Sequence, residues 1–227
     1  MNDIVVVTTS CYKYNHIWPI YFRLFKKYWP DCPYNFMLLT DVGKYEDIQV
    51  FSTGKDFGWA SNLKKLLENV KEEKVILLVE DLLLCNYVNT KMVMQASHYL
   101  DKYSLGVVRL EPYHKQTKFG LKDWEIDENY GVINKYDNYS VSIQPSVWRK
   151  STLMQLLLNG ETAWDVEIKG SLRCYSIVES FISLKPGKEK IVPYIYGLKR
   201  GIYLAPAIEL ITKEGLAEFL NKDHMGS

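Results

Sequence analysis

The sequence contains few cysteines, and those present lie far apart. Only four of the 227 residues are cysteine, at Cys11, Cys32, Cys85 and Cys174, and none belongs to a CxxC pair. Disulfide frameworks and structural zinc sites need paired or closely spaced cysteines, so this pattern favours neither. We therefore expect free thiols in a reducing compartment, and hence a cytoplasmic protein.

Long apolar runs are missing as well. Residues 1–3 lack the basic start of a secretory signal, and the apolar run after them is short. The most apolar stretch, residues 75–84, is interrupted by Glu80 and Asp81, so we expect no transmembrane segment. Peripheral contact with a membrane stays open. Residues 224–227 resemble a cloning scar, and we leave them out of any candidate site.

Neither sign of charge is in excess. Lysine and arginine number 28 against 27 aspartates and glutamates, which gives a formal net charge of +1. Proteins built around nucleic acid or anionic lipid usually carry a marked positive excess. The balance argues against a nucleic-acid-binding protein.

Four common active-site motifs are also absent. The sequence has no GxGxxG after its first predicted strand, no phosphate-binding P-loop, no GxSxG and no HExxH. These absences argue against the usual dinucleotide-binding proteins, P-loop enzymes, serine hydrolases and zinc proteases. The histidines His16, His98 and His114 form no metal-ligand pattern. A nucleotide could still bind, but not through a glycine-rich phosphate loop.

Aromatic residues, by contrast, are abundant, with 17 Tyr, 6 Trp and 8 Phe. Tyrosine and tryptophan combine a flat apolar face with a polar edge, which suits ligands that are both apolar and hydroxylated. The same residues could equally fill a compact core.

The first half of the chain alternates strand and helix patterns. Apolar runs without polar alternation predict buried strands, and apolar residues at helical spacing predict helices. Strands are predicted at 4–8, 35–40, 48–51, 74–79 and 105–109, and helices at 16–28, 59–70 and 89–102. This alternation predicts an α/β fold with a mostly parallel central sheet, and a ligand at the carboxyl ends of its strands.

The second half has a mixed pattern. Residues 111–138 are polar and aromatic without periodicity, which predicts a long loop or small subdomain. Thr162 and Asp165 have the spacing of a variant capping box, which predicts the start of a helix. The remaining predictions are strands at 139–143, 191–196 and 202–204, a helix at 151–158, and two short helices at the end.

Carboxylates follow two of the predicted strands directly. Asp41 ends the second strand, and Glu80 and Asp81 end the most apolar one. An acidic pair at the mouth of a sheet is costly unless a cation or a donor compensates it. Mg²⁺ and Mn²⁺ prefer such oxygen ligands and can carry a nucleotide diphosphate. A simpler interpretation is that the pair only ends a strand.

Several segments, taken in order, resemble glycosyltransferases of the GT-A fold. The first set comprises Thr-Thr-Ser at 8–10, Asp41, Trp59-x-x-Asn62-Leu63 and Ile76-Leu-Leu-Val-Glu80-Asp81. The second set, Gln144-x-x-x-Trp148 and Trp164-x-x-Glu167, resembles the acceptor half of bacterial and large-virus enzymes that assemble surface polysaccharide or protein glycans. The resemblance covers residues 4–204. It departs from the family at Glu80, where Asp-Asp or Asp-x-Asp is more common.

The resemblance implies one GT-A domain over residues 1–223, in which residues 1–110 bind a nucleotide-diphosphate sugar, with a UDP-sugar favoured. It implies that Asp81, helped by Glu80, holds Mn²⁺ or Mg²⁺ against the diphosphate, which the metal neutralises as it leaves. The other residues expected at the donor are Thr8, Thr9, Ser10, Asp41, Trp59, Asn62, Lys199 and Arg200.

The resemblance assigns the glycan acceptor to residues 111–223. Glu167 is the first choice for the base that deprotonates the acceptor hydroxyl, and Asp165 is the second, although its capping position offers a structural explanation. The aromatic residues Tyr113, Trp124, Tyr130, Trp148 and Trp164 are candidates for the acceptor wall, or for the core.

The sequence therefore predicts a metal-dependent, inverting glycosyltransferase acting in polysaccharide biosynthesis. A retaining transferase, a catalytically inactive sugar- or nucleotide-binding module and a metal-dependent phosphoesterase remain as alternatives. The transferred sugar, the donor base, the acceptor and the oligomeric state are left open.

Overall fold

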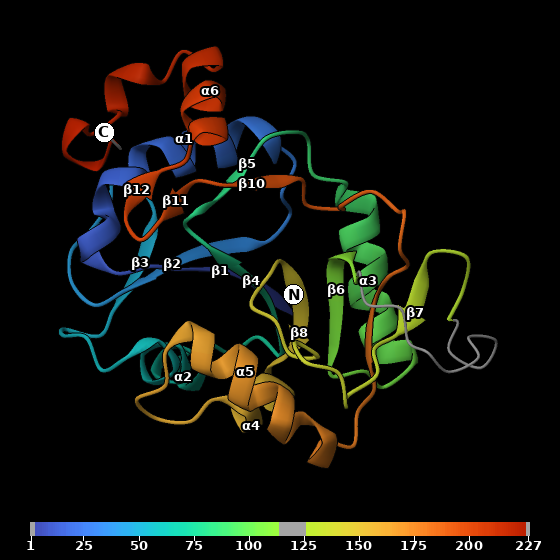
Figure 1. Cartoon of the computed structure of the whole chain (residues 1–227). Helices are drawn as coiled ribbons and strands as arrows, with labels where there is room; N and C mark the ends of the chain where they lie inside the picture. Colours follow the sequence, from blue (N-terminus) through green and yellow to red (C-terminus); the bar gives the residue numbers. More distant parts are fainter. Residues whose placement is uncertain (1–2, 114–125, 226–227) are drawn as a thin grey trace.

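The computed structural model describes residues 3–113 and 126–225, and it contains a central mixed sheet with helices on both faces (Figure 1). Across the sheet the strands lie in the order β3-β2-β1-β4-β8-β6-β9-β7. Their bounds are β1 (Ile4–Thr9), β2 (Asn35–Thr40), β3 (Gln49–Ser52), β4 (Lys74–Val79), β6 (Val107–Pro112), β7 (Tyr130–Val132), β8 (Ser146–Arg149) and β9 (Phe181–Leu184).

Strand β1 lies in the middle of a parallel half. It pairs in parallel with β2 on one side and β4 on the other, and β2 pairs in parallel with β3. Every residue of β1 is buried, because helices cover both faces of the sheet. This burial explains why its sequence lacks polar alternation. The prediction of a mostly parallel sheet in the first half is confirmed.

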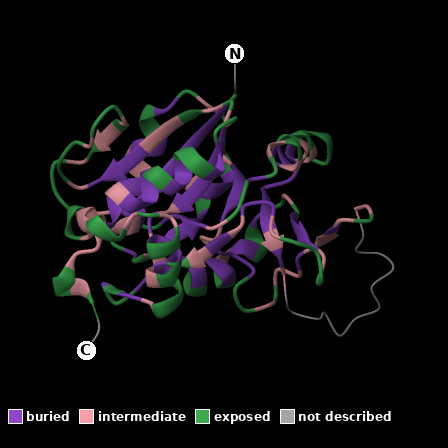
Figure 2. Cartoon of the chain, turned by 90° about the horizontal axis from the view of Figure 1, so that it is seen from above, coloured by how far each residue is buried: buried purple, intermediate pink, exposed green. Residues whose placement is uncertain are grey.

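The helices form two layers. One layer contains α1 (Trp18–Tyr28), α3 (Thr90–Lys102) and α6 (Ala205–Lys213), and the other contains α2 (Trp59–Asn69), α4 (Lys150–Leu156) and α5 (Ala163–Arg173). Alternate β1 residues enter separate cores, with Val6 toward the first layer and Val7 toward the second. Figure 2 shows the buried sheet residues between more exposed helix surfaces. Short 3-10 segments are η1 (Tyr12–Ile17), η3 (Cys174–Ser176), η4 (Ala217–Phe219) and η5 (Lys222–His224).

The second half of the sheet is mixed. Strand β8 runs antiparallel to both β4 and β6, while β9 is parallel to β6 and antiparallel to β7. The predicted strand at 139–143 is wrong, because these residues form turns and bends, and the strand begins at Ser146, after Pro145. Two small sheets, β5 (Leu82–Leu84) with β10 (Tyr194–Tyr196) and β11 (Leu198–Lys199) with β12 (Ile202–Tyr203), complete the described strands.

Two predicted helix starts have the expected side-chain caps. The Asn89 side chain accepts a hydrogen bond from the Met92 amide at the start of α3. At the start of α5, Thr162 and Asp165 form a reciprocal capping box. Such caps satisfy amide groups that have no partner within the helix.

Two further sequence expectations concern the cysteines and the membrane. All four cysteines are free thiols. Within residues 3–113 and 126–225, every helix is too short or too polar to cross a membrane.

Candidate functional site

The carboxyl ends of β1, β2 and β4 meet at one edge of the parallel half. The Ser10 amide, just after β1, donates to the carbonyl of Leu39 in β2 at 2.9 Å. The Glu80 amide, just after β4, donates to the carbonyl of Thr9 at 3.3 Å. The candidate donor residues Ser10, Asp41, Glu80 and Asp81 therefore follow three neighbouring strands at the same edge, where ligands of α/β sheets usually bind.

Within residues 3–113 and 126–225, no cationic side chain pairs with the acidic pair Glu80–Asp81. Glu80 is 6% exposed, and burial together with the charge of Asp81 raises its pKa to about 8. Burial raises the pKa of Asp81 to about 6. No ion pair among the described residues includes either carboxyl group. Two such groups side by side favour the binding of a cation, which would stabilise their ionised forms.

The negative charge of this pair also reaches its neighbours. The pKa of the Cys11 thiol is raised to about 11 by burial, by Glu80 and by Asp41. Burial, with smaller contributions from Cys11, Glu80 and Asp81, raises the pKa of Tyr14. The turn after β1 therefore lies in a field of like negative charge.

Thr8 and Thr9 are positioned as structural residues. Both are buried, at 0% and 1% exposure. The Thr8 hydroxyl lies 2.7 Å from the hydroxyl of Tyr21 in α1. The Thr9 hydroxyl donates to the Leu78 carbonyl at 3.3 Å and accepts from the Trp59 indole at 3.1 Å. These partners tie β1 to α1, α2 and β4, so both hydroxyls are engaged within the protein.

Ser10 and Asp41 are partly accessible at the same edge. The Ser10 hydroxyl accepts a hydrogen bond from the Trp18 indole at 2.8 Å. Asp41 Oδ1 accepts from the Tyr12 amide at 2.6 Å and from the Thr40 hydroxyl at 3.1 Å. These bonds hold the carboxylate beside the turn after β1, and the described residues supply no donor to Asp41 Oδ2.

Trp59 and Asn62 organise the start of α2. The Trp59 indole reaches Thr9, as described above, and Asn62 is 5% exposed. Asn62 accepts from the Phe57 amide at 3.1 Å and donates to Asp56 at 3.0 Å. Asn62 therefore braces the loop that precedes the helix, next to the β1 edge.

Lys199 and Arg200 lie at the tip of the β11–β12 hairpin and are exposed. Arg200 and Gly201 have positive φ angles of 54° and 82°, as a tight two-residue hairpin turn requires. The base of the hairpin adjoins the acidic pair, because the Gly197 amide donates to the Asp81 carbonyl. A Cβ atom at Gly197 would lie 3.1 Å from that oxygen, so this close approach needs glycine.

Glu167, the first candidate base, is held by the segment before β8. It is 8% exposed, and its Oε1 accepts from the Ser142 hydroxyl at 2.9 Å and the Ile143 amide at 3.0 Å. The described residues supply no donor to Oε2. One carboxylate oxygen is thus fixed while the other stays free for a proton.

Asp165 and Trp164 occupy the first turn of α5. Asp165 Oδ2 accepts from the Thr162 amide and hydroxyl at 3.1 and 2.7 Å, and Oδ1 pairs with Lys169 at 2.8 Å. The Lys169 ammonium and Thr162 hold the pKa of Asp165 well below its usual range. The carboxylate is engaged as a cap, whereas Trp164 is 70% exposed and free to contact a ligand.

The other aromatic candidates differ in their exposure. Trp148 and Tyr130 are 1% and 0% exposed, so they fill the core and line no surface. Tyr113 is half-buried, stacks near the guanidinium of Arg109 at 5.0 Å, and contacts Asp137 at 3.3 Å. Trp124 lies outside the described residues.

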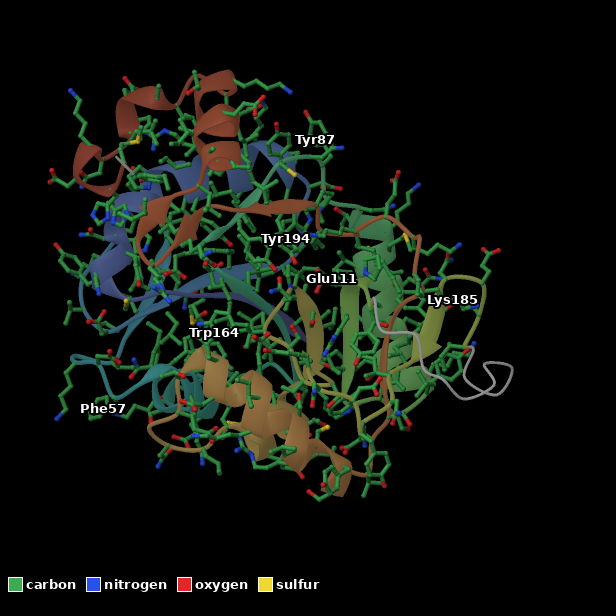
Figure 3. All side chains as sticks on the ribbon, in the orientation of Figure 1. Phe57, Tyr87, Glu111, Trp164, Lys185 and Tyr194 are labelled. Carbon is green, nitrogen blue, oxygen red and sulfur yellow. The ribbon has the colours of Figure 1, made fainter. Side chains whose placement is uncertain are left out.

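Sequence reasoning missed a polar cluster formed by Glu111, Gln144, Tyr194 and Tyr196. The Tyr194 hydroxyl lies 2.6 Å from Glu111 Oε2 and contacts Gln144 Oε1, and Gln144 Nε2 donates to Tyr196 at 3.2 Å. Figure 3 shows Glu111 and Tyr194 next to each other near the centre of the molecule, with Trp164 at the start of α5. The only sequence signal was Gln144, which stood in the motif but had no assigned role.

The edge formed by the carboxyl ends of β1, β2 and β4, here called the donor edge, could hold a cation whose coordination a bound substrate completes. Among residues 3–113 and 126–225, no three His, Cys, Asp or Glu side chains converge as a full ligand set. Mg²⁺ is commonly bound by one or two carboxylates together with substrate phosphates and water. Asp81 and Glu80 supply such a partial set.

Comparison with known proteins places this geometry in a known fold. No protein-family model matches the sequence, and no curated protein is significantly similar to it. The structure of S. aureus TarS 1-349 in complex with UDP-GlcNAc is similar, with a TM-score of 0.55 and 13% identity over 97% of this chain and 68% of that one. The chain has a GT-A-like glycosyltransferase fold.

A second solved structure is similar over most of the chain. The mannosyltransferase PcManGT from Pyrobaculum calidifontis, in complex with GDP-Man and Mn²⁺, has a TM-score of 0.52 and 12% identity, over 88% of this chain and 58% of that one. The longer S. aureus TarS structure is matched over only 41% of its length. The chain therefore spans about two thirds or less of these relatives, and such low identities establish the fold alone.

Proposed function

We propose that this chain is a metal-dependent glycosyltransferase that moves a sugar from a nucleotide diphosphate to a hydroxyl of a glycan. The observation that carries the proposal is the uncompensated pair Glu80–Asp81 at the carboxyl end of β4, in a GT-A-like fold. Similar structures are complexes with UDP-GlcNAc, or with GDP-Man and Mn²⁺. Those ligands combine a diphosphate with a sugar, which suits an acidic, cation-binding edge.

The donor half of the mechanism uses the strand ends. Asp81 and Glu80 would hold the divalent cation, and Asp41 Oδ2 would accept a hydrogen bond from the ribose or base of a nucleotide, UDP in the first instance. Lys199 and Arg200, on the hairpin that begins beside Asp81, supply positive charge to the same phosphates. When bound, the cation neutralises the diphosphate leaving group.

The acceptor half of the mechanism uses Glu167. Its Oε1 is fixed by Ser142 and Ile143, so Oε2 is oriented to take the proton of the acceptor hydroxyl. The hydroxyl oxygen then forms the new bond to the sugar carbon while the bond to the diphosphate breaks on the opposite side. This geometry inverts the configuration of that carbon. NMR of the product measures the resulting anomeric configuration.

A thermal-shift screen of nucleotide sugars, with and without Mn²⁺, tests the donor assignment. We expect UDP-sugars with Mn²⁺ to raise the melting temperature, because a ligand that binds only the folded state stabilises it by mass action. Asp81→Asn should abolish this Mn²⁺-dependent shift. The control is Glu209→Gln, which removes one negative charge, as Asp81→Asn does, from an exposed residue of α6. It should leave the shift intact.

Two results would contradict the donor assignment. One is a parent protein whose melting temperature no nucleotide sugar changes in the presence of Mn²⁺. The other is an Asp81→Asn variant that responds to the donor and Mn²⁺ as the parent does.

A further inference from the structure

The four side chains of Glu111, Gln144, Tyr194 and Tyr196, here called the Glu111 cluster, have no role in the function proposed above. They come from the end of β6, the segment before β8, and β10. Their contacts form one chain from Glu111 through Tyr194 and Gln144 to Tyr196. The cluster is therefore a single polar unit built from distant parts of the sequence.

The Glu111 cluster is linked to both ends of the candidate site. Gln144 directly follows Ser142 and Ile143, which hold Glu167. On the other side, Tyr196 pairs with Leu82, the residue after Asp81, in the β5–β10 ladder. The cluster thus lies between the candidate base and the candidate cation site.

Electrostatics gives independent support for this placement. Burial raises the pKa of Tyr196, and the charges of both Glu111 and Glu167 add to that increase. The pKa of the buried Arg109 is lowered by burial, and the same two carboxylates oppose that change. Glu111 and Glu167 therefore both lie near Tyr196 and Arg109.

The Glu111 carboxylate keeps unused acceptor capacity. Its Oε2 lies 2.6 Å from the Tyr194 hydroxyl, and the described residues supply no donor to Oε1. Lys190 compensates the charge of Glu111 only at a distance, with 4.0 Å between Nζ and Oε2. A ligand that brings hydroxyl donors would satisfy the surplus acceptor oxygens.

The cluster also reaches the surface. Tyr194 is 5% exposed, whereas Tyr196 is 51% exposed and presents an aromatic face. Its ring stands edge-on to Tyr194, with 5.8 Å between centroids. Sugar rings combine hydroxyl groups with an apolar face, and an exposed tyrosine beside polar acceptors suits both features.

We propose that the Glu111 cluster is a second acceptor subsite, which binds a hydroxyl group neighbouring the one that Glu167 deprotonates. This inference rests on the proposed function, which already takes a glycan as the acceptor, and adds the residues that bind a second hydroxyl of that glycan. A pyranoside ring carries adjacent hydroxyls and can fill both subsites. A serine or threonine side chain has a single hydroxyl and can fill only one, so two subsites favour a carbohydrate acceptor over a protein side chain.

Direct acceptor binding tests the subsite without any donor. Saturation-transfer NMR titrations would use the methyl pyranosides of glucose, galactose, mannose and N-acetylglucosamine, with N-acetylserine methylamide as the single-hydroxyl probe. At least one pyranoside should bind the parent, and the serine derivative should bind about tenfold more weakly or not at all, because it loses a hydrogen bond to a charged group.

Variants of the cluster make the test specific. Glu111→Gln and Tyr196→Phe should each weaken pyranoside binding about tenfold, since the first removes the charge of the acceptor and the second removes a hydroxyl of the cluster. Glu189→Gln, an exposed change close to Lys190, is the matched control and should bind as the parent does. Melting temperatures verify that each variant is folded, and Tyr196, being exposed, is the variant with the smaller risk to folding.

Three outcomes would overturn the subsite: no binding of any pyranoside, equal binding of the serine derivative, or unchanged pyranoside binding in folded Glu111→Gln and Tyr196→Phe. Donor binding is measured separately, with UDP-GlcNAc and Mn²⁺. A parent that binds a pyranoside through the Glu111 cluster but binds no nucleotide sugar refutes the proposed function and retains the subsite.

Discussion

The two halves of the sheet position their polar residues in different ways. In the parallel half, Asp41, Glu80 and Asp81 directly follow strands, and the parallel pairing of β1 with β2 and β4 brings their carboxyl ends to one edge. In the mixed half, Glu111 and Glu167 come from a strand and a helix, and contacts through the 142–144 segment and Tyr194 connect them.

This difference separates local from long-range information. In a parallel sheet, residues that directly follow neighbouring strands lie close together at one edge. Short sequence patterns are therefore sufficient to predict which of these residues are neighbours. In the mixed half, neighbourhood depends on the insertion of β8 between β4 and β6, which no local pattern encodes. The parallel edge carries the proposed donor chemistry, and the mixed half carries the proposed acceptor chemistry.

The largest effect that tests this division is expected from Glu167→Gln. The substitution removes the proposed base while keeping a group that can still accept from Ser142 and Ile143. We expect the transfer rate to fall by about 10²–10⁴-fold, which is typical for loss of a general base. Donor affinity, measured by calorimetry with UDP-GlcNAc and Mn²⁺, should stay close to that of the parent.

The opposite result is expected for Asp81→Asn, which should lose donor affinity as well as transfer. If Glu167→Gln weakens donor binding as much as Asp81→Asn does, the two halves do not divide the reaction as proposed. Transfer by Glu167→Gln at the parent rate would remove Glu167 as the base.

Substitutions of two tryptophans in the mixed half distinguish a role in core packing from a role in ligand binding. Trp148 is 1% exposed and its ring packs edge-on against Phe181, whereas Trp164 is 70% exposed. Trp148→Ala should therefore lower the free energy of unfolding by about 3–5 kcal/mol. Trp164→Ala should change stability little and raise the KM for a glycan acceptor. Denaturant unfolding and acceptor kinetics distinguish the two effects, and a destabilised Trp164→Ala would contradict this assignment.

The sequence predicted the parallel half well, because its signals are local. Runs such as 74–79 are buried on both faces and contain no polar alternation, and they became strands at the predicted positions. The ligand-binding roles of individual residues were harder to predict. Thr8 and Thr9 lie at the expected strand end, but their hydroxyls form hydrogen bonds with Tyr21, Leu78 and Trp59.

Outside the parallel half the sequence failed where short strands pair over long distances. Strands β5, β7 and β11 have only two or three residues each, too few for periodicity to be detected. Trp148 and Tyr130 could not be assigned to core or surface from residue type alone. The contacts of Glu111 with Tyr194 depend on β10 pairing with β5, which only the folded chain reveals.

The acidic pair predicts a pH dependence of stability for the donor edge in a metal-free sample. Unfolded Glu80 titrates near its ordinary pKa of 4.5, and folded Glu80 near about 8. Between these values folding takes up a proton, so stability should fall as pH rises toward 8. We expect a loss of about 3–4 kcal/mol between pH 5 and pH 8, or about 6–16 °C in melting temperature.

Melting curves at a series of pH values with a chelator measure this loss. Glu80→Gln should reduce the dependence, because its side chain does not titrate, and should leave the contribution of Asp81 below about pH 6. Mn²⁺ with UDP should also reduce it, since a bound cation favours the ionised carboxylates. A parent protein that becomes more stable from pH 5 to pH 8 without metal would refute the assigned electrostatics.

The smallest effect is expected at the start of α5, where a cap lies two residues from the proposed base. Thr162→Ala removes the hydroxyl that accepts from the Asp165 amide, and should lower the free energy of unfolding by about 1 kcal/mol. Asp165→Asn retains an oxygen for the Thr162 amide, so the transfer rate should remain near that of the parent if Asp165 only caps the helix. A large loss of transfer in folded Asp165→Asn, with donor affinity unchanged, would instead make Asp165 the base and leave Glu167 as the residue that anchors the 142–143 segment.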